Sequence, residues 1–537
     1  MDPRTVSAPL AWWQTRTFVL LLALATTIPL LWPDIPPLVD LPGHMGRYRV
    51  EMAIAQHPAL GRWYDFRWSL IGNLGIDLLV IPLAKVFGLE LAVKLIVITI
   101  PALTVAGLLW IAREVHGRVP ATALFALPLA YSYPFQFGIV NFALSMALAL
   151  NLFALWLRLG RLNRFGLRAA VFVPASCLLW LCHTFGWGTL GVLAFSAEMI
   201  RQHDRLADGR NGHWLESWVR AGLGCLPLAL PLVLMIVWRS GDHVGGQTGD
   251  WFNWQAKISW VTMVLRDRWM AFDLLSVAVL FLIVLKGFTD PRIEYSRHLG
   301  LSAAFLLAVF VLLPRIVFGS AYADMRLAPF VLAVAIIAIR PRAGLSFRSA
   351  ARFAALGLAF FGVRLVGTTI SYVLYDRSTG RALTALARVP EGARVVSFVG
   401  RRCRDDWAYS RLEHIPAMLI VRRLAFSNDQ WSMAGAQQLT TRYAAAKGFA
   451  HDPSQIVTDV RCHGEWWRPL DRALNRFPRD AFDYVWLLNP PRYDPALVKG
   501  LTPIWRDGAN VLFRVDDRTQ PAPVDPPQAP MFSKPHV

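Results

Sequence analysis

The stretch TFVLLLALATTIPLLW occupies residues 17–32, and the stretch PLVDLPGHMGRYRVEMAIAQ follows at residues 37–56. The first stretch is apolar enough to enter a bilayer, whereas the second carries a carboxylate, a histidine and two arginines within residues 40–49. A short polar turn would suffice to leave the membrane. The two stretches therefore predict a membrane helix that opens directly into a loop equipped with reactive side chains.

The composition extends this prediction to the whole chain. Hydrophobic residues make up 55% of the 537 residues, charged residues only 17%, and the mean hydropathy is +0.40. Such a chain needs lipid as its solvent, so we expect an integral membrane protein. The formal charge of +19 does not indicate a nucleic-acid partner, because the arginines occur mainly in short runs between apolar segments, as in cytoplasmic loops.

Spanning helices need about 20 apolar residues. Eleven segments qualify as predicted spans: 17–33, 91–112, 119–135, 139–157, 168–183, 185–200, 220–238, 272–288, 299–317, 326–340 and 353–374. Residues 76–88 are ambiguous, because this apolar segment is short and is interrupted by Pro82 and Lys85.

The basic loops resolve this ambiguity, because such loops should share the cytoplasmic side. If residues 76–88 do not span, all five basic loops fall on that side: 113–118, 158–168, 201–219, 286–298 and 341–352. We therefore expect about eleven spans, a cytoplasmic N-terminus, an uncleaved signal anchor and a periplasmic C-terminus. The external surface then includes the loop 34–90, with residues 76–88 as a juxtamembrane or re-entrant helix.

The C-terminal part of the chain is more polar. Residues 376–518 predict a periplasmic α/β domain, with strand-like runs at 393–400, 482–489 and 510–515. Cys403 and Cys462 lie in this region and are expected to be able to form a disulfide if it is exported. Residues 519–537 are rich in proline and predict a disordered tail.

Asp40, His44 and Arg47 are the first candidate site residues. If Pro42 opens a helix, Asp40 and His44 approach each other near its N-terminal end, and Arg47 follows one turn later. A carboxylate, an imidazole and a guanidinium together suit deprotonation of a hydroxyl while an anionic leaving group is held. The alternative is a capped loop helix with a surface salt bridge.

Other polar residues lie at or between predicted spans. Asp324 and Arg326 lie at an outer end, where Arg326 either binds a lipid phosphate or snorkels to the interface. Arg364 lies within an apolar segment, so it should face a wet cavity, an anionic lipid head, a backbone carbonyl or a buried acid. His183 lies at an external turn, where it either binds a sugar or phosphate or caps a helix. Asn141 lies at another external turn beside tyrosines, where it is a candidate to bind substrate; the alternative is that this turn belongs to the aromatic belt at the membrane interface.

The first span, the long loop with its early aspartate, and NLGIDLLVIPLAKVFGLELAVKL at 73–95 resemble the GT-C glycosyltransferases that use lipid-phosphate sugars. This group includes bacterial lipid A aminoarabinose transferases and eukaryotic protein O-mannosyltransferases. The resemblance covers about residues 15–200 and, more weakly, PRIVFGSAYADMRLAPF at 314–330.

The resemblance implies a GT-C-like membrane domain at residues 1–375 and an enzyme of the bacterial inner membrane. Such an enzyme transfers a sugar from a polyprenyl-phosphate carrier to a periplasmic glycolipid, polysaccharide or protein, with inversion at the anomeric carbon. Asp40 matches the family's catalytic aspartate and would be the general base, and Arg326 would contact the carrier phosphate. Where many members have two adjacent acids, this chain has Leu41 after Asp40, so His44 is the expected orienting partner.

Two questions stay open from the sequence. A divalent cation is not assigned, because one carboxylate and one imidazole make a poor Mg²⁺ or Mn²⁺ site unless other groups converge. The function also has alternatives, namely a transporter or flippase of a lipid-linked or anionic solute, suggested by Arg364, and a periplasmic binding module anchored by the spans.

Overall fold

The computed structural model describes residues 9–206, 213–240, 248–342, 344–404, 406–432, 437–465 and 467–520. The chain forms two compact units. The helical unit comprises Met1–Pro33, Leu70–Pro82 and Ala92–Tyr372, and the mixed unit comprises Asp34–Ser69, Leu83–Leu91 and Val373–Val537. Most of the proposed tail, from residue 521 onward, lies outside the described residues.

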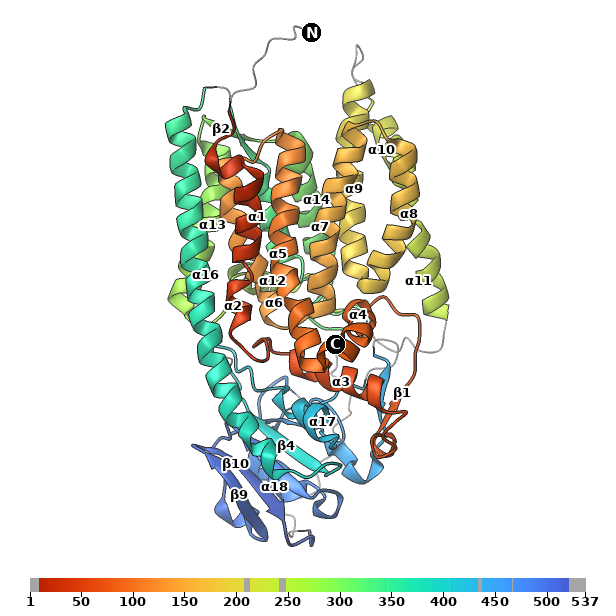
Figure 1. Cartoon of the computed structure of the whole chain (residues 1–537), viewed down its shortest axis with the longest axis vertical. Coiled ribbons are helices and arrows are strands. Elements are labelled where there is room, and N and C mark those ends of the chain that lie inside the picture. Colours follow the sequence, from red (N-terminus) through yellow and green to blue (C-terminus); the bar gives the residue numbers. More distant parts are fainter. Residues whose placement is uncertain are drawn as a thin grey trace. The chain divides into compact units, whose positions relative to one another are not determined.

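Long helices dominate the helical unit, and Figure 1 shows α5, α7, α9 and α14 running alongside one another. The helices lying wholly or mainly in this unit are α1 (Arg16–Ala25), α2 (Ile28–Leu31), α4 (Gly75–Phe87), α5 (Leu89–His116), α6 (Tyr133–Gln136), α7 (Val140–Arg161), α8 (Phe165–Cys182), α9 (Thr184–Leu206), α10 (Trp214–Gly224), α11 (Leu230–Ser240), α12 (Trp254–Thr262), α13 (Met270–Thr289), α14 (Arg297–Leu312), α15 (Ala328–Ile337) and α16 (Phe347–Leu383). Two short antiparallel strands, β2 (Ile293–Tyr295) and β3 (Ile339–Pro341), accompany them.

Five described helices are long and apolar enough to cross a membrane, and the bent pair α10 and α11 makes a sixth if it is one span. The five are α5, α7, α8, α13 and the helix beginning with α16. Three further apolar helices, α1, α14 and α15, are shorter. The membrane character is thus supported by these helices, while the number of about eleven spans stays a prediction.

Prolines explain where the helices differ from the predicted spans. The segment predicted at 119–135 forms a buried 3₁₀-helix, Ala121–Tyr131, followed by the short helix α6. Pro128 and Pro134 lie in this segment, and a proline removes a helical hydrogen-bond donor. The segment predicted at 220–238 bends by 45° between α10 and α11, next to Pro227.

The basic loops of the helical unit contact one another through side chains and one strand pairing. Three side-chain contacts join neighbouring loops: Arg161 with Glu114 at 2.7 Å, Arg205 with Asn163 at 3.2 Å, and Arg297 with Asp204 at 2.9 Å. The pairing of β2 with β3 joins the last two basic segments. The five loops that the charge pattern predicts on one side of the membrane are therefore linked to each other.

The mixed unit is built around a six-stranded sheet with the order β7-β6-β4-β8-β10-β9. Its strands are β4 (Val395–Gly400), β6 (Ile456–Thr458), β7 (Arg468–Pro469), β8 (Tyr484–Leu488), β9 (Leu501–Asp507) and β10 (Asn510–Val515). The first four run parallel, whereas β10 is antiparallel to β8 and β9. The runs predicted as strands from their apolar residues form β4, β8 and β10. Helices α17 (Met418–Arg423) and α18 (Leu470–Arg476) complete this C-terminal part.

Residues of the first loop are part of the same unit. Helix α3 (Leu41–Ala53) packs against α17, and strand β1 (Tyr64–Phe66) pairs antiparallel with β5 (Leu439–Thr441). The Tyr64 hydroxyl donates a hydrogen bond to the Ser427 carbonyl at 2.9 Å and accepts one from its backbone N–H. Apolar residues of α3, β1 and the sheet share one buried core, so the loop and the C-terminal region fold together.

Candidate functional site

Asp40 lies at the N-cap position of α3, where the chain turns into the helix. Pro42, near the start of α3, fits this position because a helix needs no N–H donor in its first turn. The Asp40 side chain makes no capping hydrogen bond, and 18% of it is exposed. Its carboxylate is therefore not occupied with the local capping role that the sequence left as an alternative.

His414, from the C-terminal part of the mixed unit, is the histidine that faces Asp40. Its Nε2 lies 3.9 Å from Asp40 Oδ1, and its Nδ1 lies 3.8 Å from Asp429 Oδ2. The side chains of His414 and Asp429 are almost fully buried, at 4% and 0% exposure. One imidazole thus lies between two carboxylates, and only Asp40 reaches solvent.

This arrangement favours the charged imidazole. Burial lowers the pKa of His414, but the adjacent Asp429 carboxylate and the charges of Asp452 and Asp40 outweigh it and raise the pKa to about 10. At neutral pH His414 is therefore an imidazolium. A buried positive charge held next to Asp40 attracts its carboxylate and fixes its orientation.

His44 has a different environment. Its ring lies 5.0 Å from that of Trp431, which in turn lies 4.4 Å from the ring of His414. Burial lowers the pKa of His44 well below its usual value, and the nearby charges of Arg47 and His414 act in the same direction. His44 is thus a neutral neighbour of the candidate site, while His414 is the histidine whose ring nitrogen lies 3.9 Å from the Asp40 carboxylate.

Two glycines of α3 allow the C-terminal segment to approach. A Cβ on Gly43 would lie 2.7 Å from Trp431 Cη2, and a Cβ on Gly46 would lie 2.6 Å from Gln430 Nε2. Real Cβ atoms do not approach so closely, so a side chain at either position would force Trp431 or Gln430 to move. The Gln430 side chain also donates a hydrogen bond to the Gly43 carbonyl at 3.2 Å. Arg47, one turn along, is buried and donates to Gln437 Oε1.

The side chains around Asp40 suit proton transfer. A partly exposed carboxylate can accept a proton from a hydroxyl, and the adjacent imidazolium can hold that carboxylate in place. Among the residues that the structure describes, no group of three or more His, Cys, Asp and Glu side chains has a metal-site arrangement. No ligand set for a divalent cation can therefore be named.

The remaining predicted site residues belong to the helical unit, and Asn141 has a structural partner set there. Its Oδ1 accepts a hydrogen bond from the Ile76 backbone at 2.7 Å. Its Nδ2 donates to Asp77 Oδ2 at 3.0 Å and to the Asn73 carbonyl at 2.8 Å. These bonds fix the start of α4 against α7.

His183 and Arg326 belong to one buried cluster with two phenylalanines. The Arg326 guanidinium lies 5.4 Å from the Phe185 ring and 6.0 Å from the Phe142 ring, and both rings also flank His183. Arg326 donates to Ser320 Oγ at 3.0 Å. The structure therefore brings these two predicted residues together.

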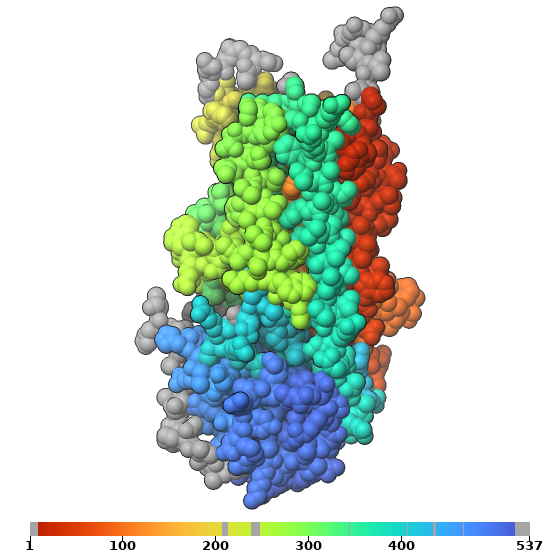
Figure 2. All heavy atoms as spheres, turned by 90° about the vertical axis from the view of Figure 1, so that its left-hand side faces the viewer, coloured from red at the N-terminus to blue at the C-terminus, as the bar shows by residue number. Residues whose placement is uncertain are grey.

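Asp324 and Arg364 each form a buried ion pair. Asp324 Oδ2 lies 3.2 Å from Lys257 Nζ, and both side chains are at most 2% exposed. Arg364 Nη1 lies 2.6 Å from Asp273 Oδ1, which joins α16 to α13. Figure 2 shows these two helices side by side on one face of the helical unit. For Arg364 the structure thus shows the buried-acid alternative.

His414, Asp429 and Trp431 were not found from the sequence. The segment SNDQ at 427–430 is a signal for Asp429, because four polar residues in a row follow an apolar run, and the structure shows all four buried. Buried polar runs are costly unless their groups are partnered, so they often mark a site. His414 has no such local signal.

Comparisons with known protein families and with curated proteins found no match for this chain.

Proposed function

We propose that this protein is a membrane glycosyltransferase that moves a sugar from a polyprenyl-phosphate carrier to an acceptor hydroxyl, with Asp40 as general base. The observation that carries this proposal is the pairing of Asp40, partly exposed and free of a capping role, with the buried imidazolium of His414. The resemblance to GT-C enzymes in the first loop supplies the substrate class.

The chemistry is an inverting displacement. The acceptor hydroxyl gives its proton to the Asp40 carboxylate while its oxygen forms a bond to the anomeric carbon. The bond between that carbon and the carrier phosphate breaks, and the electron pair leaves with the phosphate. His414 keeps the Asp40 carboxylate in position through the ion pair between its Nε2 and Asp40 Oδ1. Arg326 stays the candidate for the carrier phosphate, because guanidinium groups bind phosphate oxygens in pairs.

Membrane topology is consistent with this proposal. The first loop and the C-terminal region form one folded unit, and one folded unit cannot lie on both sides of a bilayer. An even number of crossings must then separate residues 92 and 372, and the ten predicted spans after the first loop meet this condition. The disulfide between Cys403 and Cys462 favours an oxidising compartment such as the periplasm for this unit.

The transport alternative was suggested by Arg364, and the structure gives this arginine a partner in helix packing. An arginine within an apolar segment would favour transport if it faced a wet pathway, but Arg364 is paired with Asp273 and is 3% exposed. Its role is accounted for by helix packing. We therefore prefer sugar transfer to lipid-carrier transport.

Membrane vesicles from cells that express the protein provide a test. We expect wild-type vesicles to convert endogenous lipid-linked sugar to free polyprenyl phosphate, and Asp40→Asn to reduce this rate at least about a hundredfold, the lower range for loss of a general base. Asp34→Asn is the matched control, since Asp34 is the nearest other acid in the loop. An Asp40→Asn rate equal to that of the wild type would remove Asp40 from the mechanism.

A further inference from the structure

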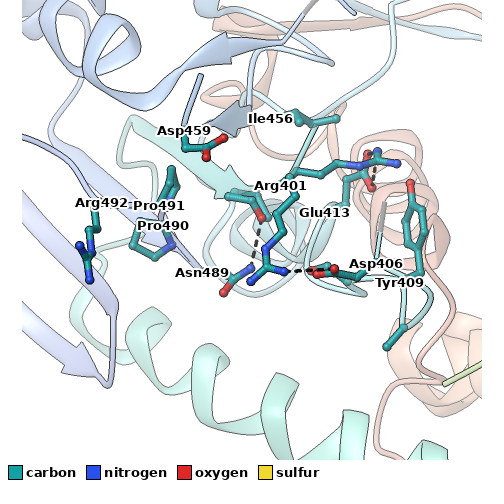
Figure 3. A pocket seen from close by; sticks show the side chains of 15 residues that line it. Arg401, Asp406, Tyr409, Glu413, Ile456, Asp459, Asn489, Pro490, Pro491 and Arg492 are labelled. Carbon is teal, nitrogen blue, oxygen red and sulfur yellow. Dashed lines mark hydrogen bonds and ion pairs between the residues drawn. The ribbon is translucent and has the colours of Figure 1, made fainter. Parts of the chain in front are cut away.

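A pocket of about 480 Å³ lies within the C-terminal part of the mixed unit, at the carboxyl ends of the parallel strands. Three strand residues line it, Val399, Gly400 and Ile456, and the other lining residues follow parallel strands: Arg401, Arg402 and five residues within 406–413 follow β4, Asp459 follows β6, and 489–492 follow β8. Figure 3 shows Arg492 on one side of this pocket and Tyr409 and Glu413 on the other. Its volume is in the range of small-molecule sites.

The strand order makes the carboxyl ends of these strands a preferred place for a ligand. The chain passes from β4 to β6 on one side and later returns to β8 on the other side of β4. Adjacent connections that leave in opposite directions open a crevice at the carboxyl ends of the strands, where open α/β sheets bind their ligands. The pocket occupies that crevice.

The rim of the pocket is held in shape. A Cβ on Gly400 would lie only 1.9 Å from the Asn489 carbonyl oxygen, so glycine is required where β4 and β8 end side by side. Pro490 and Pro491 restrict the segment after β8. The disulfide between Cys403 and Cys462 ties the segment after β4 to the segment after β6. A rim held in this way is preorganised for a ligand.

Charged side chains of both signs line the pocket in equal number. They are three arginines, Arg401, Arg402 and Arg492, and three carboxylates, Asp406, Glu413 and Asp459. Arg401 pairs with Glu413 at 3.2 Å, and Arg402 pairs with Asp406 at 3.2 Å. Tyr409, Ser410 and Asn489 add uncharged polar groups.

This balance discriminates between ligand classes. An anion would meet three carboxylates, and a cation would meet three guanidinium groups. A polyhydroxylated ligand matches both, because each hydroxyl can donate to a carboxylate and accept from a guanidinium. From this lining and the preorganised rim, we propose that the pocket binds an uncharged saccharide. This site is separate from Asp40 and does not depend on sugar transfer.

The test is saccharide binding to the full-length protein in lipid nanodiscs, measured by saturation-transfer NMR. The probes are methyl glycosides of a hexose, a 6-deoxyhexose, a heptose, a pentose and an N-acetylhexosamine, with inorganic phosphate as the anionic probe. The rim variants are Arg492→Ala and Asp459→Ala, both at exposed positions. Arg506→Ala is the matched control, because Arg506 is an exposed arginine of β9 that does not line the pocket.

We expect at least one glycoside class to bind, and both rim variants to weaken its binding about tenfold or more, with Arg506→Ala unchanged. Asp40→Asn should bind as the wild type does, so a failed transferase proposal remains distinguishable from a failed pocket proposal. The saccharide proposal is overturned if no glycoside class binds, or if both rim variants bind like the wild type. It is also overturned if phosphate alone binds and Arg492→Ala abolishes that binding.

Discussion

His414 Nε2 lies 3.9 Å from Asp40 Oδ1, and this ion pair joins the first loop of the chain to its C-terminal region. The same imidazole faces the buried Asp429 on its other side. The candidate catalytic carboxylate is thus positioned by residues that lie far away in the sequence. The C-terminal region is consequently part of the candidate site.

Replacement of His414 by glutamine tests this positioning through pH. The pKa of His414 is raised to about 10 from an ordinary value of about 6.5, so its ion pairs with Asp40 and Asp429 stabilise the fold fully below about pH 6.5. This stabilisation is lost as the pH rises toward about 10. We expect His414→Gln to have a lower Tm than the wild type at pH 7, and the difference to shrink by pH 10. Equal differences at both pH values would show that His414 is not charged in the folded protein.

Gly43→Ala tests the close approach between α3 and the C-terminal segment. The new methyl group would meet the Trp431 ring at 2.7 Å and His414 Nδ1 at 3.2 Å, which should cost about 1–3 kcal/mol and displace His414 from Asp40. We expect a loss of sugar transfer in vesicles and a lower Tm. Gly61→Ala is the control, since its added Cβ meets no atom within 4 Å. Equal behaviour of the two variants would contradict the packing described.

Arg364→Leu tests whether Arg364 acts in packing or on substrate. Loss of the guanidinium removes the ion pair with the buried Asp273, which should destabilise the protein by about 3–5 kcal/mol. The double variant Arg364→Leu/Asp273→Asn removes both charges, and we expect it to recover Tm and transfer activity together. Recovery of Tm without activity would instead assign Arg364 to the substrate.

The disulfide can be tested by Cys403→Ser/Cys462→Ser. Its removal should lower the free energy of unfolding by about 2–4 kcal/mol, because the unfolded chain gains freedom. It should also weaken binding of a saccharide by the neighbouring pocket. Cys177→Ser is the control, since Cys177 is a free thiol. An unchanged Tm in the double variant would mean that these two cysteines are not bonded in the protein.

The sequence predicted a largely helical chain and three strands of the C-terminal sheet, because apolar runs are a local property, but it missed the 3₁₀-helix at Ala121–Tyr131. β4, β8 and β10 arise from apolar runs, and the long helices arise from apolar segments. Partners of charged residues are not local. Arg168 was expected in a basic loop, yet it is buried, pairs with Glu198 at 2.5 Å and stacks on Trp156. The pairing of Asp324 with Lys257 was hidden for the same reason.

The same limit applied to the candidate site. Asp40 was found because its local sequence, a carboxylate before Pro42 at the end of a span, carries information about position. His44 was chosen as its partner because it is one helical turn away. The structure instead brings His414 to Asp40, and these two residues lie close together only when β1 pairs with β5 and α3 packs on α17. Such pairings depend on the whole fold, so a single sequence does not reveal them.

The most direct test of sugar transfer is mass spectrometry of the glycolipids and glycans of cells that carry the wild-type protein, Asp40→Asn or a deletion. The account predicts that one glycan loses the same sugar mass in both altered strains, while the Asp40→Asn protein is present in the membrane at the wild-type amount. Identical glycan profiles in all three strains would contradict the proposed transferase function.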